Sequence, residues 1–230
     1  MLKSLLFHPT AQGVMMKNRI YLIAIVLALT TFVAACAPSQ PLPGDVLFQD
    51  DFSDISSGWY RVSTTEGITN YQTGIYRILV NEAQTDVWSN PGLNFTDAII
   101  EVEATKAAGP NDNFFGVMCR YTETEEDWGF YYFLLSSDGY YGISKYSNGE
   151  YVVLGGESFP YDEDVIQHGE ATNTIEAKCV ESTLTLSING TQMMEVEDST
   201  YAAGDIGLVG TTLEEPGTDI HFDNLVVKQP

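Results

Sequence analysis

Short runs in which apolar and polar residues alternate fill most of the chain after Asp45, and no long stretch has the spacing of an amphipathic helix. The run 174–180 (TIEAKCV) has an apolar residue at every second position, and the run 184–188 (LTLSI) repeats this pattern. Successive side chains of a strand point to opposite faces, so each run predicts a strand with one buried face.

Turn signals separate these runs. Asn189-Gly190 is the dipeptide that closes a tight hairpin, and 137–139 (SDG) and 147–149 (SNG) are similar turns. Together they predict an antiparallel meander whose further strands lie in the runs 114–121, 129–135, 140–146, 151–154 and 192–196.

About a dozen strands in roughly 185 residues are too many for one open sheet, whereas two sheets packed face to face bury every apolar face. The pattern therefore predicts an all-β fold, a two-sheet antiparallel β-sandwich, formed by one domain over 46–230.

The first 35 residues have a different pattern. They contain three basic residues and no acid, and 20–33 is an uncharged apolar run of 14 residues, which is too short to span a membrane. The run ends in 33–36 (VAAC), which resembles the lipobox of bacterial lipoproteins. The resemblance implies a signal peptide over 1–35 and a lipid on the thiol of Cys36. An ordinary secretory signal, or an N-terminal anchor with an accidental cysteine, is the alternative, and Met1, Met15 and Met16 are all candidate starts.

The net negative charge of the chain excludes some classes of binding partner. The chain has 10 Lys+Arg against 32 Asp+Glu, a formal charge of -22, and from Cys36 onward 7 basic residues face the same 32 acids, giving -25. Such a surface excludes nucleic acid and is repelled by anionic lipid heads. Residues 36–45 are rich in proline and form an extended tether. We therefore expect a cell-envelope protein held at a lipid bilayer by its lipid alone.

Several motifs of the body resemble one family, the concanavalin A-like or laminin G-like jelly rolls, and most closely the bacterial lipoprotein modules grouped with 3-keto-disaccharide hydrolase-like domains. The resemblance rests on 50–53 (DDFS), 58–59 (GW), 184–190 (LTLSING), 204–208 (GDIGL) and 221–227 (HFDNLVV). It implies a jelly roll whose first and last strands lie side by side, and it carries more information about fold than about function.

Aromatic residues are the main candidates for binding. The chain has 13 Tyr, 11 Phe and 3 Trp, and sugar rings stack on such side chains. The leading hypothesis is a tethered, non-catalytic module that binds glycan through Trp88, Arg120, Tyr121, Trp128 and Tyr131. The alternative is that these aromatic residues fill the core and that Arg120 pairs with an acid. We expect Trp59 in the core.

Catalysis has a weaker basis, because the chain has no serine-hydrolase elbow, P-loop or dinucleotide fingerprint. Glu101 and Glu103 lie two residues apart on one strand face, so both could project into one groove. Glycoside hydrolysis needs two carboxylates at a set separation. They suggest a glycoside or 3-keto-sugar hydrolase, or simply a solvated strand face. A structural or protein-interaction lipoprotein is a third hypothesis.

Two further sites are expected. Jelly rolls of the resembled kind often hold a structural calcium ion near their termini, and Asp50, Asp51, Asp54 and Asp223 are the candidate ligands.

Cys119 and Cys179 remain once Cys36 is acylated, and an exported domain favours their pairing in a disulfide. Two buried free thiols are the alternative.

Overall fold

The computed structural model describes residues 41–123 and 128–230. The signal peptide, Cys36 and most of the tether lie outside these ranges. Within them the chain is all-β, and no helix is long and apolar enough to cross a membrane. The strands are β1 (Val46–Asp50), β2 (Val62–Ser63), β3 (Gly67–Tyr71), β4 (Tyr76–Val80), β5 (Asp86–Ser89), β6 (Ala98–Ala108), β7 (Phe114–Glu123), β8 (Trp128–Ser136), β9 (Tyr141–Ser147), β10 (Glu150–Leu154), β11 (Thr172–Val180), β12 (Thr183–Ile188), β13 (Thr191–Glu197), β14 (Asp205–Thr211) and β15 (Thr218–Lys228).

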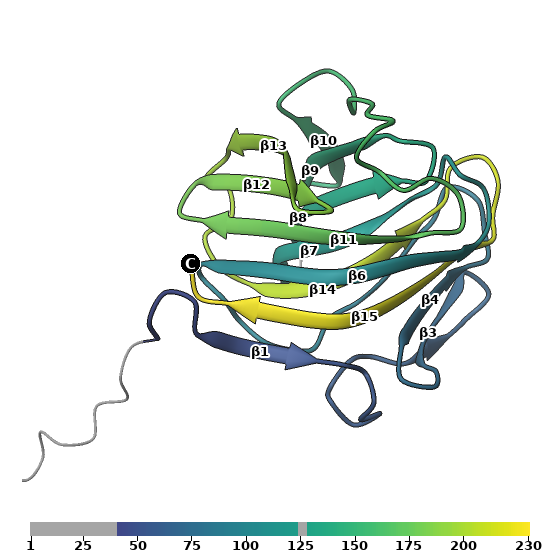
Figure 1. The fold of residues 1–230 in the computed structure, drawn as a ribbon, viewed down its shortest axis with the longest axis horizontal. Coiled ribbons are helices and arrows are strands. Elements are labelled where there is room, and N and C mark those ends of the chain that lie inside the picture. Colours follow the sequence, from purple (N-terminus) through teal and green to yellow (C-terminus); the bar gives the residue numbers. More distant parts are fainter. Residues whose placement is uncertain (1–40, 124–127) are drawn as a thin grey trace, which may run out of the picture. The chain divides into compact units, whose positions relative to one another are not determined.

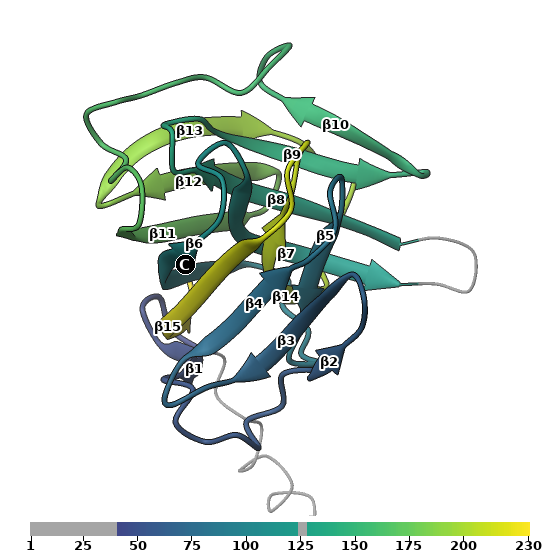
Figure 2. The ribbon, with the colours of Figure 1, turned by 90° about the vertical axis from the view of Figure 1, so that its right-hand side faces the viewer.

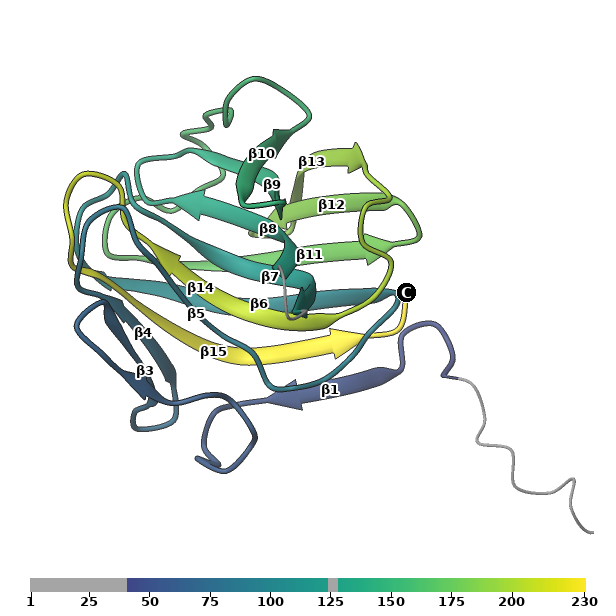
Figure 3. The same ribbon diagram turned by 180° about the vertical axis from the view of Figure 1, so that it is seen from behind.

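The strands form two antiparallel sheets packed as a sandwich, which confirms the predicted fold class. The nine-stranded sheet has the order β13-β12-β11-β6-β15-β4-β3-β2, with β1 also paired to β15. The six-stranded sheet has the order β10-β9-β8-β7-β14-β5. The first sheet lies in front in Figure 1 and the second in Figure 3, while Figure 2 shows the sandwich after a quarter turn.

The hairpins form at the predicted turns. Asn148-Gly149 and Asn189-Gly190 all have positive φ, the conformation that a two-residue hairpin loop requires. The first of these turns joins β9 to β10 and sets Tyr146 directly opposite Tyr151. This register decides which aromatic rings meet on the six-stranded sheet.

The ends of the domain are paired as the jelly-roll resemblance implied. Strand β1 runs antiparallel to β15, with Asp50 opposite Leu225, so the first and last strands of the domain are neighbours (Figure 1). Trp59 is 3% exposed, and its indole N–H donates to Asp50 Oδ2 at 3.0 Å. The expectation that Trp59 belongs to the core is confirmed.

The main core lies between the two sheets, and a disulfide crosses it. Cys119 of β7 and Cys179 of β11 are bonded, with their Cα atoms 6.8 Å apart. Since β7 and β11 belong to different sheets, the bond ties the two layers together, and the predicted pairing is confirmed. It is surrounded by inward-facing side chains that include Ile100, Val102, Phe115, Val117, Tyr131, Phe133, Ile175, Ala177, Leu186 and Leu208.

Candidate functional site

The outer face of the six-stranded sheet is apolar and aromatic. Strand β8 alternates, so that Tyr131 and Phe133 point into the main core while Phe130 and Tyr132 point outward. An antiparallel sheet commonly turns polar residues toward water, and a second apolar cluster on its outer side is typical of a binding surface. This surface, called the aromatic face below, comprises Trp88, Tyr121, Trp128, Phe130, Tyr132, Tyr146 and Tyr151 around Asp86.

A row of four rings crosses four neighbouring strands. The Tyr151 and Tyr146 ring centroids lie 4.9 Å apart, those of Tyr146 and Phe130 5.3 Å, and those of Phe130 and Tyr121 6.0 Å. The last two pairs are stacked, with interplanar angles of 10° and 20°. Because each ring fixes the next, the row is a preorganised platform.

Two tryptophans extend this platform. The Trp88 and Trp128 centroids lie 5.7 Å apart in an edge-to-face arrangement, and Trp128 lies 5.9 Å from Tyr146. Trp128 is 39% exposed and Tyr151 is 55% exposed, whereas Phe130 and Tyr132 below them are almost fully buried. The exposed rings can therefore contact a ligand, and the buried rings support them.

Asp86 at the start of β5 is the acid of this face. Its Oδ2 accepts a hydrogen bond from the Tyr151 hydroxyl at 2.5 Å and another from the Tyr132 hydroxyl at 3.2 Å. Burial raises the pKa of Asp86 above its usual value, although both hydroxyl hydrogen bonds act the other way. Burial and the Asp86 charge also raise the pKa of Tyr132 and Tyr151, so both hydroxyls stay protonated donors at neutral pH.

These hydrogen bonds show that the sheet is curved around the aromatic face. Strands β5 and β10 are its opposite edges, about 24 Å apart in a flat sheet at the usual strand spacing. Tyr151 of β10 and Asp86 of β5 nevertheless share a hydrogen bond. The outer face is therefore hollowed, and residues from both edges meet over Tyr132.

Three of the five predicted ligand-binding residues lie on this face, namely Trp88, Tyr121 and Trp128. Tyr121 stacks on Phe130, and its hydroxyl donates to Glu123 at 3.2 Å. Burial, followed by the Glu123 charge, raises the pKa of Tyr121 to about 12.

Tyr131 points the other way, into the main core. Its hydroxyl donates to Asp198 Oδ1 at 2.7 Å and accepts the N–H of Tyr201 at 3.0 Å. Burial, followed by the Asp198 carboxylate, raises the pKa of Tyr131 to about 12. The expectation that Tyr131 lines the ligand surface is corrected, because alternation along β8 puts it on the face opposite Phe130 and Tyr132.

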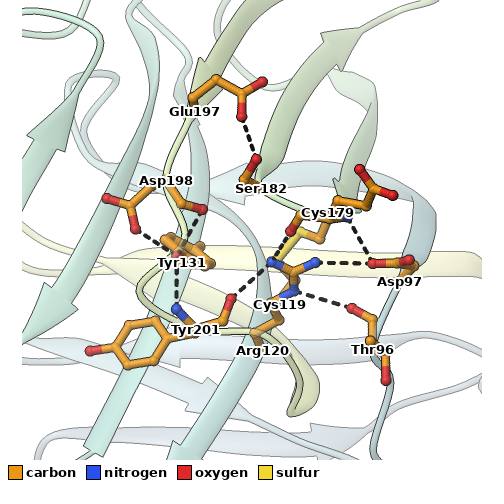
Figure 4. A network of polar contacts seen from close by, with 11 residues as sticks. Thr96, Asp97, Cys119, Arg120, Tyr131, Cys179, Ser182, Glu197, Asp198 and Tyr201 are labelled. Carbon is orange, nitrogen blue, oxygen red and sulfur yellow. Dashed lines mark hydrogen bonds and ion pairs between the residues drawn. A yellow bond between two sulfur atoms is a disulfide. The ribbon is translucent and has the colours of Figure 1, made fainter.

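Arg120 also lies away from the aromatic face. Strand β7 bulges between Cys119 and Thr122, and Arg120 has φ +55°, so regular alternation fails there. The guanidinium is 2% exposed and contacts four acceptors (Figure 4). They are Thr96 O at 3.1 Å, Glu181 O at 2.8 Å, Tyr201 O at 2.9 Å and Asp97 Oδ1 at 3.2 Å.

Arg120 therefore fastens three loops beside the disulfide, and its expected role in ligand binding is corrected. Gly204 belongs to the same arrangement, since a Cβ there would lie 2.4 Å from the Tyr121 carbonyl oxygen. The bulge and the close approach of this glycine turn Arg120 away from the aromatic face and Tyr121 onto it.

The carboxylate pair proposed for catalysis lies on the other sheet. Glu101 and Glu103 share the outer side of β6, as the two-residue spacing predicts, and Glu103 accepts a hydrogen bond from Asn224 at 3.1 Å. Glu101 stands opposite Glu176 of β11. Since β6 belongs to the nine-stranded sheet, this pair and the aromatic face cannot act on one bound sugar.

The candidate calcium ligands serve local turns. The Asp50 carboxylate accepts hydrogen bonds from the Phe52 N–H, the Ser57 hydroxyl and the Trp59 indole N–H. The Asp51 carboxylate accepts one from the Ser53 hydroxyl, and the Asp54 carboxylate accepts one from the Ser56 hydroxyl. The serine hydrogen bonds lower the pKa of Asp51 and of Asp54. Asp223 accepts the N–H of Asn224. Within 41–123 and 128–230 no group of three His, Cys, Asp or Glu side chains is arranged to hold a metal, and the calcium site stays a prediction.

Five residues of the aromatic face were missed in the sequence: Asp86, Phe130, Tyr132, Tyr146 and Tyr151. Tyr146 and Tyr151 flank the Asn148-Gly149 turn, so hairpin register alone places them opposite each other. Tyr132 follows from the alternation of β8. Nothing in the sequence indicates Asp86, because its contacts depend on the curvature of the sheet.

Comparison with known proteins shows the fold. No family model matches the chain, and no curated protein matches it. Among solved structures, carbohydrate binding module CBM66 from Bacillus subtilis is similar with a TM-score of 0.58 and 14% identity, over 75% of this chain and 96% of the module. A Bacillus subtilis protein of unknown function with a galectin-like fold has a TM-score of 0.61 and 13% identity, over 83% and 98%.

Bacillus licheniformis beta-glucanase has a TM-score of 0.59 and 10% identity, over 83% of this chain and 100% of the enzyme. At these identities the likeness concerns the fold alone. The chain has the galectin-like, concanavalin A-like jelly-roll sandwich that these structures share.

We predict that Arg120→Ala lowers the free energy of unfolding by about 3 kcal/mol or more, because it removes a buried guanidinium and leaves three backbone carbonyls without their side-chain donor. Arg77→Ala is the matched control. It breaks the Arg77–Asp219 pair, 2.7 Å long and partly exposed, and should remove about 1 kcal/mol or less. Urea denaturation of both variants measures the difference. Equal stability of the two variants would contradict the anchoring role of Arg120.

Proposed function

We propose that the domain is a carbohydrate-binding module whose ligand lies on the aromatic face. The single observation that carries the proposal is the platform of at least partly exposed rings, Trp88, Trp128, Tyr146 and Tyr151, held in fixed positions around the carboxylate of Asp86. The apolar face of a pyranose stacks on such rings, and a few polar groups then fix its orientation. Structural neighbours include a carbohydrate binding module and a beta-glucanase, which supports a glycan-related role.

Binding without turnover is the form of this function that the geometry favours. The Glu101 and Glu103 pair belongs to the nine-stranded sheet, whereas the platform belongs to the six-stranded sheet. Membership of the 3-keto-disaccharide hydrolase-like family, and hydrolysis with it, remains a hypothesis. A glycan-array screen followed by a hydrolysis assay on its hits separates the cases: binding alone supports the proposal, turnover contradicts its non-catalytic form, and absence of any glycan signal favours a structural or protein-interaction role.

Trp128→Ala is predicted to weaken glycan binding by about 2 kcal/mol, or about 30-fold, because it removes an exposed stacking ring. Trp88→Ala should act in the same direction. Titration calorimetry with a glycan from the screen measures the loss, and thermal unfolding checks that each variant is folded.

Tyr161→Ala is the matched control for this loss. Tyr161 is half exposed and packs on Tyr140, beyond the other end of β8 from Trp128, so its removal should leave the affinity unchanged. If Trp128→Ala binds as tightly as Tyr161→Ala, the aromatic face is not the binding surface.

The proposed module is held at the outer side of a bacterial membrane by a lipid on Cys36. The lipobox-like segment 33–36, the apolar run before it and the proline-rich tether after it support this proposal, and all of them except residues 41–45 of the tether lie outside the described residues. The strongly acidic body favours attachment through the lipid alone.

Cys36→Ser should therefore yield an unprocessed or released protein. Detergent-phase partitioning together with intact-mass measurement tests this outcome. A Cys36→Ser protein that partitions into detergent with the same processed mass as the wild type would show that the lipid is not attached at Cys36.

A further inference from the structure

Asp86 is a partly buried carboxylate that lacks a cationic partner in the described structure. Its hydrogen bonds come from two neutral hydroxyls, those of Tyr132 and Tyr151, and both reach the same oxygen, Oδ2. No hydrogen bond to Oδ1 from the described residues is present. Burial of a charged carboxylate without a counter-charge is unfavourable, and burial raises the pKa of Asp86 accordingly.

The basic residues of the same sheet are engaged elsewhere. In its described strands they are Arg120 of β7 and Lys145 of β9. Arg120 pairs with Asp97, and Lys145 pairs with Asp198 at 2.5 Å. Both ion pairs lie away from the aromatic cluster, so the described part of the aromatic face presents negative charge without a compensating positive charge.

The rings around Asp86 suit a bound cation. The faces of Trp and Tyr rings attract ammonium groups, and this attraction is stronger where water is excluded. Tyr151 is stacked on Tyr132 with centroids 5.9 Å apart, and both hydroxyls converge on the carboxylate. A protonated amine placed here would meet ring faces and a carboxylate oxygen with unused hydrogen-bonding capacity.

We propose that the aromatic face binds an amino sugar, whose protonated amine pairs with the Asp86 carboxylate against the exposed ring of Tyr151, with Tyr132 supporting that ring from below. This inference rests on the proposed carbohydrate-binding function and names its ligand class. A glycan bearing carboxylate, sulfate or phosphate groups would meet Asp86 and the net negative charge of the protein, and is disfavoured.

Three soluble hexasaccharide probes of one backbone test the proposal. Hexamers of β-1,4-linked glucose, glucosamine and N-acetylglucosamine differ at carbon 2, which bears a hydroxyl, an ammonium or an acetamide. Titration calorimetry of the full chain at pH 6 and 150 mM salt should show the glucosamine hexamer binding at least tenfold more tightly than the other two. This ratio is the size expected of one charge-assisted hydrogen bond.

Asp86→Asn should reduce this preference to about twofold or less without unfolding the protein, because it removes a buried charge that has no ion pair. Glu176→Gln is the matched control. It makes the same change of charge on the outer side of the nine-stranded sheet and should retain the preference. Unspecific attraction of a cationic sugar to an acidic protein would be weakened equally in both variants.

Two outcomes would overturn the inference. Equal affinity for the glucose and glucosamine hexamers, with both lost in Trp128→Ala, would leave the carbohydrate-binding function standing and remove the amino-sugar preference. A glucosamine hexamer that does not bind, or whose preference persists in Asp86→Asn, also contradicts the inference. The glycan-array screen decides separately whether the protein binds any sugar.

Discussion

Strand β8 carries aromatic and aliphatic side chains on both of its faces, and both faces have to be kept from water. The inner face is shielded from water because it packs on the nine-stranded sheet, as in other sandwiches. The outer face has no second sheet to pack on. It is covered by the sheet's own curvature, which brings Asp86 and Trp88 from one edge strand over Tyr132 and beside Trp128.

The two sides of the six-stranded sheet have different roles: the contacts on the inner side stabilise the fold, and the outer side is the proposed binding surface. The disulfide and the Arg120 contacts lie on the inner side, where they tie together the sheets and three loops. The partly exposed rings of Trp128 and Tyr151 lie on the outer side, supported by the buried rings of Phe130 and Tyr132. Rigid support for exposed rings reduces the conformational entropy lost on binding.

Much of the fold follows from local patterns in the sequence. Apolar runs and alternation located strands β7 to β13, the Asn-Gly turns predicted two hairpins, and the pairing of Cys119 with Cys179 followed from the expectation of an exported domain. The positions of Arg120, Tyr131 and Asp86 could not be predicted from the alternation of apolar and polar residues. Arg120 faces inward because of a bulge with positive φ. Tyr131 faces inward by alternation along β8, but β8 is apolar on both faces, so its sequence does not show which face is the outer one. Asp86 meets Tyr132 across three strand boundaries and Tyr151 across five, which a sequence pattern does not reveal.

The three tryptophans allow the central claim, that ligand binds on the outer face of the six-stranded sheet, to be tested in one spectrum. Trp59 is buried beside Asp50, whereas Trp88 and Trp128 belong to the aromatic face. In a ¹⁵N–¹H spectrum titrated with a bound glycan, the indole N–H resonances of Trp88 and Trp128 should shift and that of Trp59 should stay in place. A glycan that binds without moving either Trp88 or Trp128 would contradict the account.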